Sequence, residues 1–122
     1  MTKARRGLGA LGERLAREQL ERDGYQVLET NYRSRMGELD LVALEGGCLV
    51  GIEVRTKRGS AFGTPEESVG PRKARRLADL VVQYGQRHEG LPEDLRVDFV
   101  AVELTSDGRL IRLDVIKNAV TE

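Results

Sequence analysis

Cysteine and histidine are nearly absent from this chain of 122 residues, which has one of each, Cys48 and His88. A single cysteine excludes a disulfide within the chain. Without a cluster of the two residue types, a zinc site is not expected. The lone His88 follows a predicted helix, a position more typical of a surface cation than of a catalyst.

Long hydrophobic runs are absent as well. The basic N-terminal segment, with Arg5 and Arg6, is not followed by an apolar stretch, and no other segment is long enough to cross a membrane. We therefore expect a cytoplasmic protein without a signal peptide. The 20 basic and 20 acidic residues give a formal net charge of zero. Net charge alone thus predicts no partner, although local clusters of arginine and lysine are compatible with a polyanion.

The composition, 39% hydrophobic and 33% charged, is that of one globular domain covering residues 1–122. Apolar residues at helical spacing predict amphipathic helices at 8–23 and 71–87. Alternating or apolar segments predict five strands, at 25–30, 36–44, 49–57, 95–104 and 109–116. The order α-β-β-β-α-β-β indicates an α/β fold on the border of α+β, with a mixed five-stranded sheet flanked by helices.

The connections predict how the strands pair. Those between the first three strands are short, and Gly46-Gly47 reads as a hairpin turn, so these strands are expected to be antiparallel. The strand at 95–104 follows a helix and is expected to run parallel to the strand before that helix. The connection at 59–70 is long for a compact domain, and either a flap over a site or a plain surface excursion would account for it.

Polar and apolar residues alternate along both strands of the hairpin at 36–57. A strand period of two is expected to separate them onto opposite faces. On the first strand, one face is expected to carry Glu38 and Asp40 and the other Leu39, Leu41 and Ala43. On the second strand, one face is expected to carry Glu53 and Arg55 and the other Val50, Ile52 and Val54.

If the two polar faces lie together, Glu38, Asp40 and Glu53 converge with Arg55 beside them. Lys57 joins them only if the strand continues that far. Carboxylates that converge beside a cation are a candidate site for a hard metal ion and a phosphate. The alternative is a partly buried network of ion pairs, which is the commoner arrangement in proteins.

Several segments taken together resemble the YraN-type family of small bacterial proteins, and the resemblance covers nearly the whole chain. They are Gly-Glu-Arg-Leu-Ala at 12–16, Gly-Tyr-Gln-Val-Leu-Glu-Thr-Asn-Tyr-Arg at 24–33, Gly-Glu-Leu-Asp-Leu-Val at 37–42, Leu-Val-Gly-Ile-Glu-Val at 49–54, Phe-Gly-Thr-Pro-Glu-Glu-Ser-Val at 62–69, Lys73, and Arg-Val-Asp-Phe-Val-Ala-Val at 96–102. The family is similar to archaeal Holliday-junction resolvases and to the restriction-endonuclease-like, PD-(D/E)XK proteins. The resemblance implies their mixed sheet flanked by helices, in agreement with the order of elements.

The resemblance also implies roles at matched positions. Asp40 and Glu53 would bind Mg²⁺ or Mn²⁺, and the carbonyl of Val54 would complete the coordination. Glu13 would be an acid carried by the first helix and facing the site, with Glu38 as a neighbour in the same cluster. These carboxylates and Arg55 are the candidate catalytic residues.

Three further positions bear on that assignment. Lys73 matches a helix lysine of the family, and Asp98 matches the aspartate of its late strand. Arg55 departs from the pattern, because the Glu-x-Lys motif of the superfamily expects lysine there. Arginine stays protonated and cannot act as a general base, although it can clamp a phosphate or stabilise a transition state. In the second helix, Lys73 lies at the border of the apolar stripe, whereas Arg72, Arg75 and Arg76 are expected to point away from it.

Three functions follow as hypotheses. The first is a metal-dependent endonuclease that hydrolyses phosphodiester bonds, with branched or structured DNA as its substrate. The second is a nucleic-acid-binding protein on a nuclease fold whose cleavage is weak or lost, and the third is a protein-interaction module that retains only the fold. The basic residues expected to contact nucleic-acid phosphates are Arg33, Arg35, Lys57, Arg58 and Lys73. The resemblance to resolvases allows a homodimer, but no segment of the sequence marks its interface.

Overall fold

A computed structural model describes residues 3–59 and 70–119, and within the first helix the side chains beyond residue 8. The elements are α1 (Lys3–Arg22), β1 (Gln26–Ser34), β2 (Gly37–Glu45), β3 (Cys48–Arg58), α2 (Pro71–Arg87), β4 (Leu95–Leu104) and β5 (Leu110–Ile116). This confirms the predicted order. The segment considered as a flap lies, apart from its two ends, outside the described residues. No helix in the described part of the chain is long and apolar enough to span a membrane.

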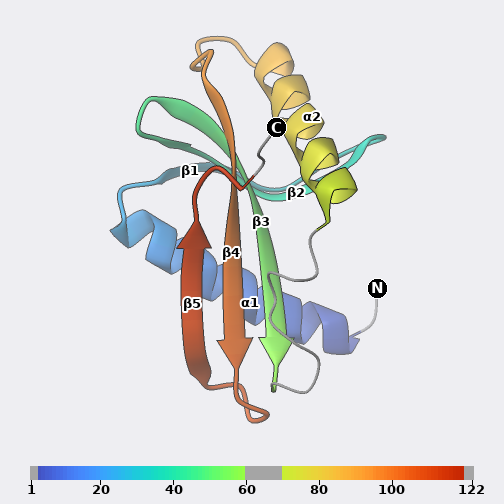
Figure 1. Cartoon of the computed structure of the whole chain (residues 1–122), viewed down its shortest axis with the longest axis vertical. Helices are drawn as coiled ribbons and strands as arrows, with labels where there is room; N and C mark the ends of the chain where they lie inside the picture. Colours follow the sequence, from blue (N-terminus) through green and yellow to red (C-terminus); the bar gives the residue numbers. More distant parts are fainter. Residues whose placement is uncertain (1–2, 60–69, 120–122) are drawn as a thin grey trace.

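The strands form one mixed sheet in the order β1-β2-β3-β4-β5. β3 and β4 are parallel, joined by the α2 crossover, and β1–β2 and β2–β3 are antiparallel, as predicted. β4 and β5 are antiparallel too. α2 lies in front of the sheet in the view of Figure 1, and α1 crosses behind it. The sheet is therefore covered by one helix on each face.

Each helix packs on its own hydrophobic cluster. Ala16 and Leu20 of α1 are buried in a cluster with Leu41, Ile52 and Val100, among other residues. On the opposite face, the cluster that includes α2 consists of Tyr32, Leu39, Val42, Leu49, Leu77, Leu80, Val81, Tyr84 and Val97. The two clusters fix both helices against the central strand β3.

Two glycines allow the helices to lie close to β3. A Cβ atom built on Gly51 would lie 2.3 Å from Cγ2 of Val81 in α2. One built on Gly12 of α1 would lie 1.8 Å from Oγ1 of Thr56. Since real Cβ atoms do not approach other atoms this closely, any larger residue at either position would have to displace a helix or its neighbour.

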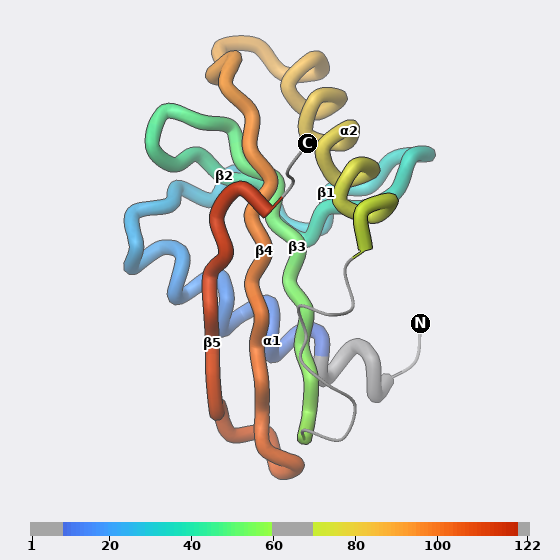
Figure 2. The backbone as a smooth tube through the Cα atoms, in the orientation of Figure 1, coloured from blue at the N-terminus to red at the C-terminus, as the bar shows by residue number. Residues whose placement is uncertain are grey.

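The predicted alternation of β2 is wrong at one point. Leu41 packs in the cluster under α1, whereas Leu39 packs in the cluster under α2, so the two leucines do not share a face. The cause is a change of pairing: β2 is in register with β3 from Leu41 to Glu45, and its earlier residues pair with β1 alone. Across from this point in β1, Asn31 has a left-handed φ of 54°. Figure 2 shows the β1–β2 hairpin turning away from the later half of β3.

The ends of the elements differ from those expected. α1 begins at Lys3 instead of residue 8, and β1 continues to Ser34 instead of stopping at residue 30. The added part of β1 has little β-strand pattern of its own and owes its conformation to pairing with β2, which outweighs local preference. β3 continues to Arg58, so Lys57 does lie on the strand.

Candidate functional site

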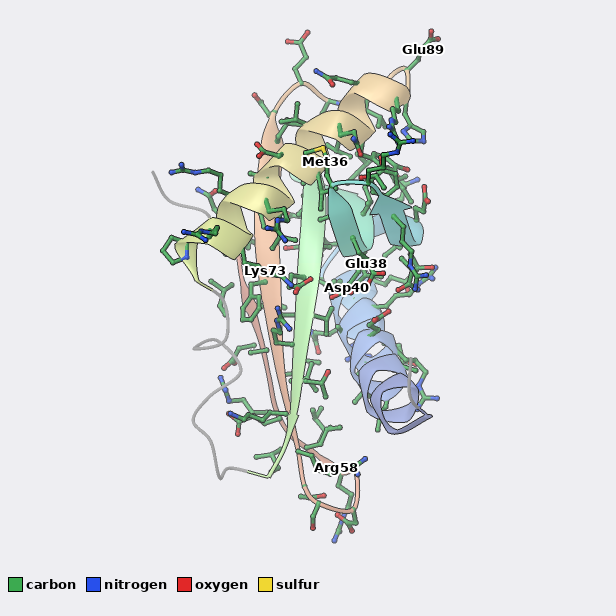
Figure 3. All side chains as sticks on the ribbon, turned by 90° about the vertical axis from the view of Figure 1, so that its right-hand side faces the viewer. Met36, Glu38, Asp40, Arg58, Lys73 and Glu89 are labelled. Atoms are coloured by element: carbon green, nitrogen blue, oxygen red, sulfur yellow. The ribbon has the colours of Figure 1, made fainter. Side chains whose placement is uncertain are left out.

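A cavity of about 900 Å³ opens where β2 leaves β3. Its described walls come from α1, from the β1–β2 hairpin, from the middle of β3 and from the first half of α2. In Figure 3, the labelled residues Glu38 and Asp40 lie beside β3 between the two helices, with Lys73 projecting from α2. The parting of the two strands therefore creates the space in which polar side chains from five elements meet.

The centre of the cavity is formed by Asp40 and Glu53. Oδ2 of Asp40 accepts a hydrogen bond of 2.8 Å from the backbone amide of Val54, one of the β3 groups that β2 no longer reaches. Glu53 is only 5% exposed. Both carboxyls line the cavity, Asp40 from β2 and Glu53 from β3.

Burial and the crowding of acids raise the pKa of two carboxyls of the cavity, Asp40 and Glu13. Burial, followed by the charge of Glu53, raises the pKa of Asp40 to about 8, although the hydrogen bond from Val54 acts in the opposite direction. Burial also raises the pKa of Glu13, with smaller contributions from Glu38 and Glu53. Four carboxyl groups thus interact within the cavity, and their mutual repulsion is of the kind that a bound cation relieves.

Two cations converge on one oxygen of Glu53. Nη2 of Arg55 lies 3.0 Å and Nζ of Lys73 lies 3.1 Å from the same Oε2 atom. Nε of Arg55 is buried, and the described residues supply no hydrogen-bond acceptor for it. A buried donor without a partner is costly, so this guanidinium is suited to an anionic ligand that enters the cavity.

Most of the residues predicted for the site line the cavity. They are Glu13, Arg33, Glu38, Asp40, Glu53, Val54, Arg55 and Lys73. Arg33 also forms an ion pair of 2.7 Å with Glu38. The convergence expected from the two polar strand faces is therefore present, although it is achieved by a break in β2 and not by regular alternation.

Three of the predicted nucleic-acid contacts lie elsewhere. Arg35, Lys57 and Arg58 are not among the described residues that line the cavity. Figure 3 shows Arg58 at the far end of β3, well away from Lys73 and Asp40. Any contact that these three residues make with a nucleic acid would be outside the cavity.

Asp98, matched to the family by its strand position, is also outside the cavity. It is fully buried and accepts hydrogen bonds from Tyr25 Oη at 2.6 Å, Arg96 Nε at 2.8 Å and the Asn118 amide at 2.9 Å. Burial, together with Asp98, raises the pKa of the Tyr25 hydroxyl. A carboxylate satisfied in this way holds β4 to its surroundings and has no free position for a ligand.

Sequence reasoning missed some of the lining. Arg76 lines the cavity, although it was expected to point away from the apolar stripe of α2, and Asn31 and Ser34 of β1 line it too. A signal for Arg76 was present, because it lies three residues after Lys73 and so shares its side of the helix. Asn31 and Ser34 gave no such signal, since their position depends on how far β1 extends.

The comparisons with known proteins agree with the resemblance. The model of the Uncharacterised protein family UPF0102 matches residues 12–102, and the chain belongs to that family. A UPF0102 protein of Symbiobacterium thermophilum is 46% identical over 114 residues, which cover 93% of this chain and 96% of the relative. Another, of Dehalococcoides mccartyi, is 44% identical over 118 residues, or 97% and 96% of the two chains. One of Moorella thermoacetica is 44% identical over 119 residues, or 98% and 99%.

Proposed function

We propose that this protein is a metal-dependent endonuclease that hydrolyses DNA phosphodiester bonds in the cytoplasm, with branched or structured DNA as its substrate. The observation that carries the proposal is that Asp40 and Glu53 line one cavity together with Arg55 and Lys73, which both pair with Glu53. Acidic groups for a metal and basic groups for a phosphate are the two requirements of phosphodiester hydrolysis.

The donor set fits Mg²⁺ or Mn²⁺. Carboxylate oxygens are ligands for hard cations, and magnesium is usually held by one or two carboxylates while keeping several waters. In the described part of the chain, no three His, Cys, Asp or Glu side chains form a group that could hold a metal ion. The site would therefore rely on Asp40 and Glu53, with the carbonyl of Val54. When bound, the ion would supply a Lewis acid that neutralises charge on the phosphate.

The basic residues would bind the DNA backbone. Arg55 presents a buried Nε that has no acceptor among the described residues, and guanidinium groups suit phosphate oxygens. Lys73 and Arg76, one turn apart on α2, extend the positive wall of the cavity, and Arg33 contributes from β1. These contacts would orient the scissile phosphate against the carboxylates and would be independent of base sequence.

A second function, nucleic-acid binding with weak or lost cleavage, is favoured by one specific observation. Glu53 already pairs with two cations, Arg55 and Lys73, which compete with a metal for the same carboxylate oxygen. Arg55 also occupies the position where the motif expects lysine, and arginine cannot take a proton from water.

Single-turnover cleavage of labelled branched, flapped, single-stranded and duplex DNA, with Mg²⁺ or Mn²⁺, tests the proposal. We expect slow metal-dependent cleavage by the native protein, loss of it in Asp40→Asn and Glu53→Gln, and retention in Arg58→Ala, whose side chain is remote from the cavity. Cleavage that persists in Asp40→Asn would identify a contaminant. Salt-dependent DNA binding without cleavage by any protein would favour the second function.

A further inference from the structure

β5 forms one edge of the sheet, and in the described part of the chain no strand lies beyond it. Its residues Leu110 and Ile111 are 49% and 57% exposed, the highest values among the large hydrophobic side chains that the structure describes. An edge strand presents unpaired backbone N–H and C=O groups, and proteins commonly guard it with lysine, proline or a bulge. β5, with the sequence Leu-Ile-Arg-Leu-Asp-Val-Ile, contains neither lysine nor proline.

The opposite edge of the sheet is protected differently. β1 has a register shift between Val27 and Glu29 and a left-handed residue at Asn31, and both interrupt a flat edge. β5 also has a register shift, but only at its start: Leu110 pairs with Leu104 and Arg112 with Glu103, so Ile111 is an extra residue there. From Arg112 to Ile116 its register with β4 is regular. The two edges thus differ, and β5 is the one able to accept another strand.

We infer that β5 pairs with the β5 strand of a second copy of this chain, antiparallel across a two-fold axis, to give one continuous ten-stranded sheet. In the register we propose, the two-fold axis passes through Leu113, which then lies opposite the partner's Leu113. Arg112 lies opposite the partner's Asp114 in that register, and Asp114 lies opposite the partner's Arg112. The register shift at Ile111 ends the regular pairing, and the exposed Leu110 and Ile111 lie beside the end of the partner's β5.

Charge selects this register over its neighbours. Residues directly opposite in an antiparallel pair have Cβ atoms about 4.5–5.5 Å apart, so like charges there are unfavourable. A pairing centred on residue 112 sets two arginines opposite each other, and one centred on residue 114 sets two aspartates opposite each other. Within one copy, Arg112 forms ion pairs with Glu103 of β4 and with Asp114 of its own strand. The partner's Asp114 would extend those pairs into a ladder of alternating charge across three strands.

The interface is small. One strand of seven residues from each copy buries an area at the low end for specific complexes, below about 1,200 Å². The dimer is therefore expected to form at concentrations of roughly micromolar and above, and to dissociate on dilution. No residue of β5 lines the described part of the cavity, so the inference goes beyond the proposed function and is tested without any measurement of cleavage.

Charge-reversal variants test the proposed β5–β5 interface. Their association is measured by sedimentation velocity over a series of protein concentrations. Asp114→Arg sets arginine opposite arginine, and Arg112→Asp sets aspartate opposite aspartate, so each variant alone should remain monomeric where the native protein dimerises. Mixed together, the two variants place opposite charges on every strand pair and should form a heterodimer. Thermal melting of each variant separates this effect from unfolding. A native protein that stays monomeric at all concentrations, or a dimer that both variants retain, would overturn the inference.

Cysteine cross-linking tests the register. In a Cys48→Ser background, which removes the only native thiol, Leu113→Cys should form a disulfide-linked dimer on mild oxidation because its two copies meet at the axis. Arg112→Cys and Asp114→Cys should cross-link at least tenfold more slowly, because neither faces its own copy. Equal rates for the three variants would show random collision and would contradict the proposed pairing.

Discussion

The carboxylate of Asp40 lies 2.8 Å from the amide nitrogen of Val54 and accepts its hydrogen bond at the point where β2 parts from β3. One residue therefore satisfies the backbone of the open strand and also supplies an acid to the cavity. That acid is buried, and burial together with the charges of Glu53 and Glu13 raises its pKa. A site built in this way lowers the stability of the fold in the range of pH where the acids ionise.

The first prediction is a dependence of stability on pH. A carboxyl whose pKa is raised to about 8 on folding binds its proton more tightly in the folded state. The stabilisation that this carboxyl gives the folded state is complete below its unfolded pKa of about 3.9 and is lost as the pH rises through its folded pKa. The free energy of unfolding should therefore fall between these limits, by at most about 1.4 kcal/mol per pH unit from this group. Urea unfolding at pH values from 5 to 8.5 measures this free energy, and its dependence on pH should be weaker in Asp40→Asn than in the native protein. The same dependence in both proteins would contradict the raised pKa of Asp40.

The second prediction separates the two roles of Asp40. At pH 5, where its carboxyl is protonated, Asp40→Asn should leave the free energy of unfolding nearly unchanged because the amide oxygen still accepts from Val54. Asp40→Ala leaves that buried amide without an acceptor, which costs about 1–3 kcal/mol. Denaturant unfolding of the three proteins at this pH provides the comparison. If the two variants lose the same free energy of unfolding, the hydrogen bond to the Val54 amide does not explain the destabilisation.

The third prediction concerns the packing of α1 against β3. Gly12→Ala should destabilise the protein by about 1–3 kcal/mol, because the new methyl group overlaps Thr56 and the helix must shift. Gly9→Ala is the matched control in the same helix. A Cβ atom at Gly9 meets nothing within 4 Å, so alanine there should stabilise by about 0.5–1 kcal/mol through helix propensity. Thermal melts that rank the two variants in the opposite order would contradict this account of the packing.

The large elements could be predicted because their signals are local. The apolar stripe of α2 and the Gly46-Gly47 turn can each be recognised within one short segment of the sequence. The parallel pairing of β3 and β4 follows from the helix between them. The approach of Asp40 and Glu53 to one cavity could be predicted for a similar reason, since they lie on the two strands of one hairpin. That prediction rested on regular strand alternation, which is present at Glu53 in β3 but is broken in β2 between Leu39 and Leu41.

What could not be predicted depends on where strands separate. Nothing in the sequence around Asp40 indicates that β2 leaves β3 there, because the break is set by β1 pairing and by the left-handed Asn31 across from it. Arg58 looked close to Glu53 in sequence, but a strand rises about 3.3 Å per residue and carries it far from the cavity. The burial of Asp98 requires Tyr25 and Arg96, and the contact with Tyr25 spans 73 positions in the sequence.

The fourth prediction sets metal binding against DNA binding. Lys73→Met removes a cation that lies 3.1 Å from Glu53 and competes with a divalent ion. Affinity for Mn²⁺ should therefore rise, whereas affinity for DNA should fall. Because the Lys73 side chain is 42% exposed, solvent screens the charge and each change should be about two- to fivefold. Calorimetry and fluorescence anisotropy measure the two affinities.

Lys117→Met is the matched control for that experiment. Lys117 is half exposed and pairs with Glu45 at 3.2 Å, but it does not line the described cavity. Neither affinity should change in this variant. If both lysine variants weaken DNA binding equally, the effect is one of general charge, and Lys73 has no special place at the site.

The last prediction concerns Arg55, which shares Oε2 of Glu53 with Lys73. If an amine at the motif position activates water, Arg55→Lys should raise the rate of single-turnover cleavage, by as much as the 10²–10⁴-fold typical of general acid–base catalysis. If the position supplies only charge, the lysine variant should cleave no faster than the native protein, and Arg55→Ala should lose activity. The double variant Arg55→Lys/Lys73→Met decides which amine matters. A gain that persists without Lys73 assigns the role to position 55, whereas a gain that disappears makes Lys73 the amine on which cleavage depends.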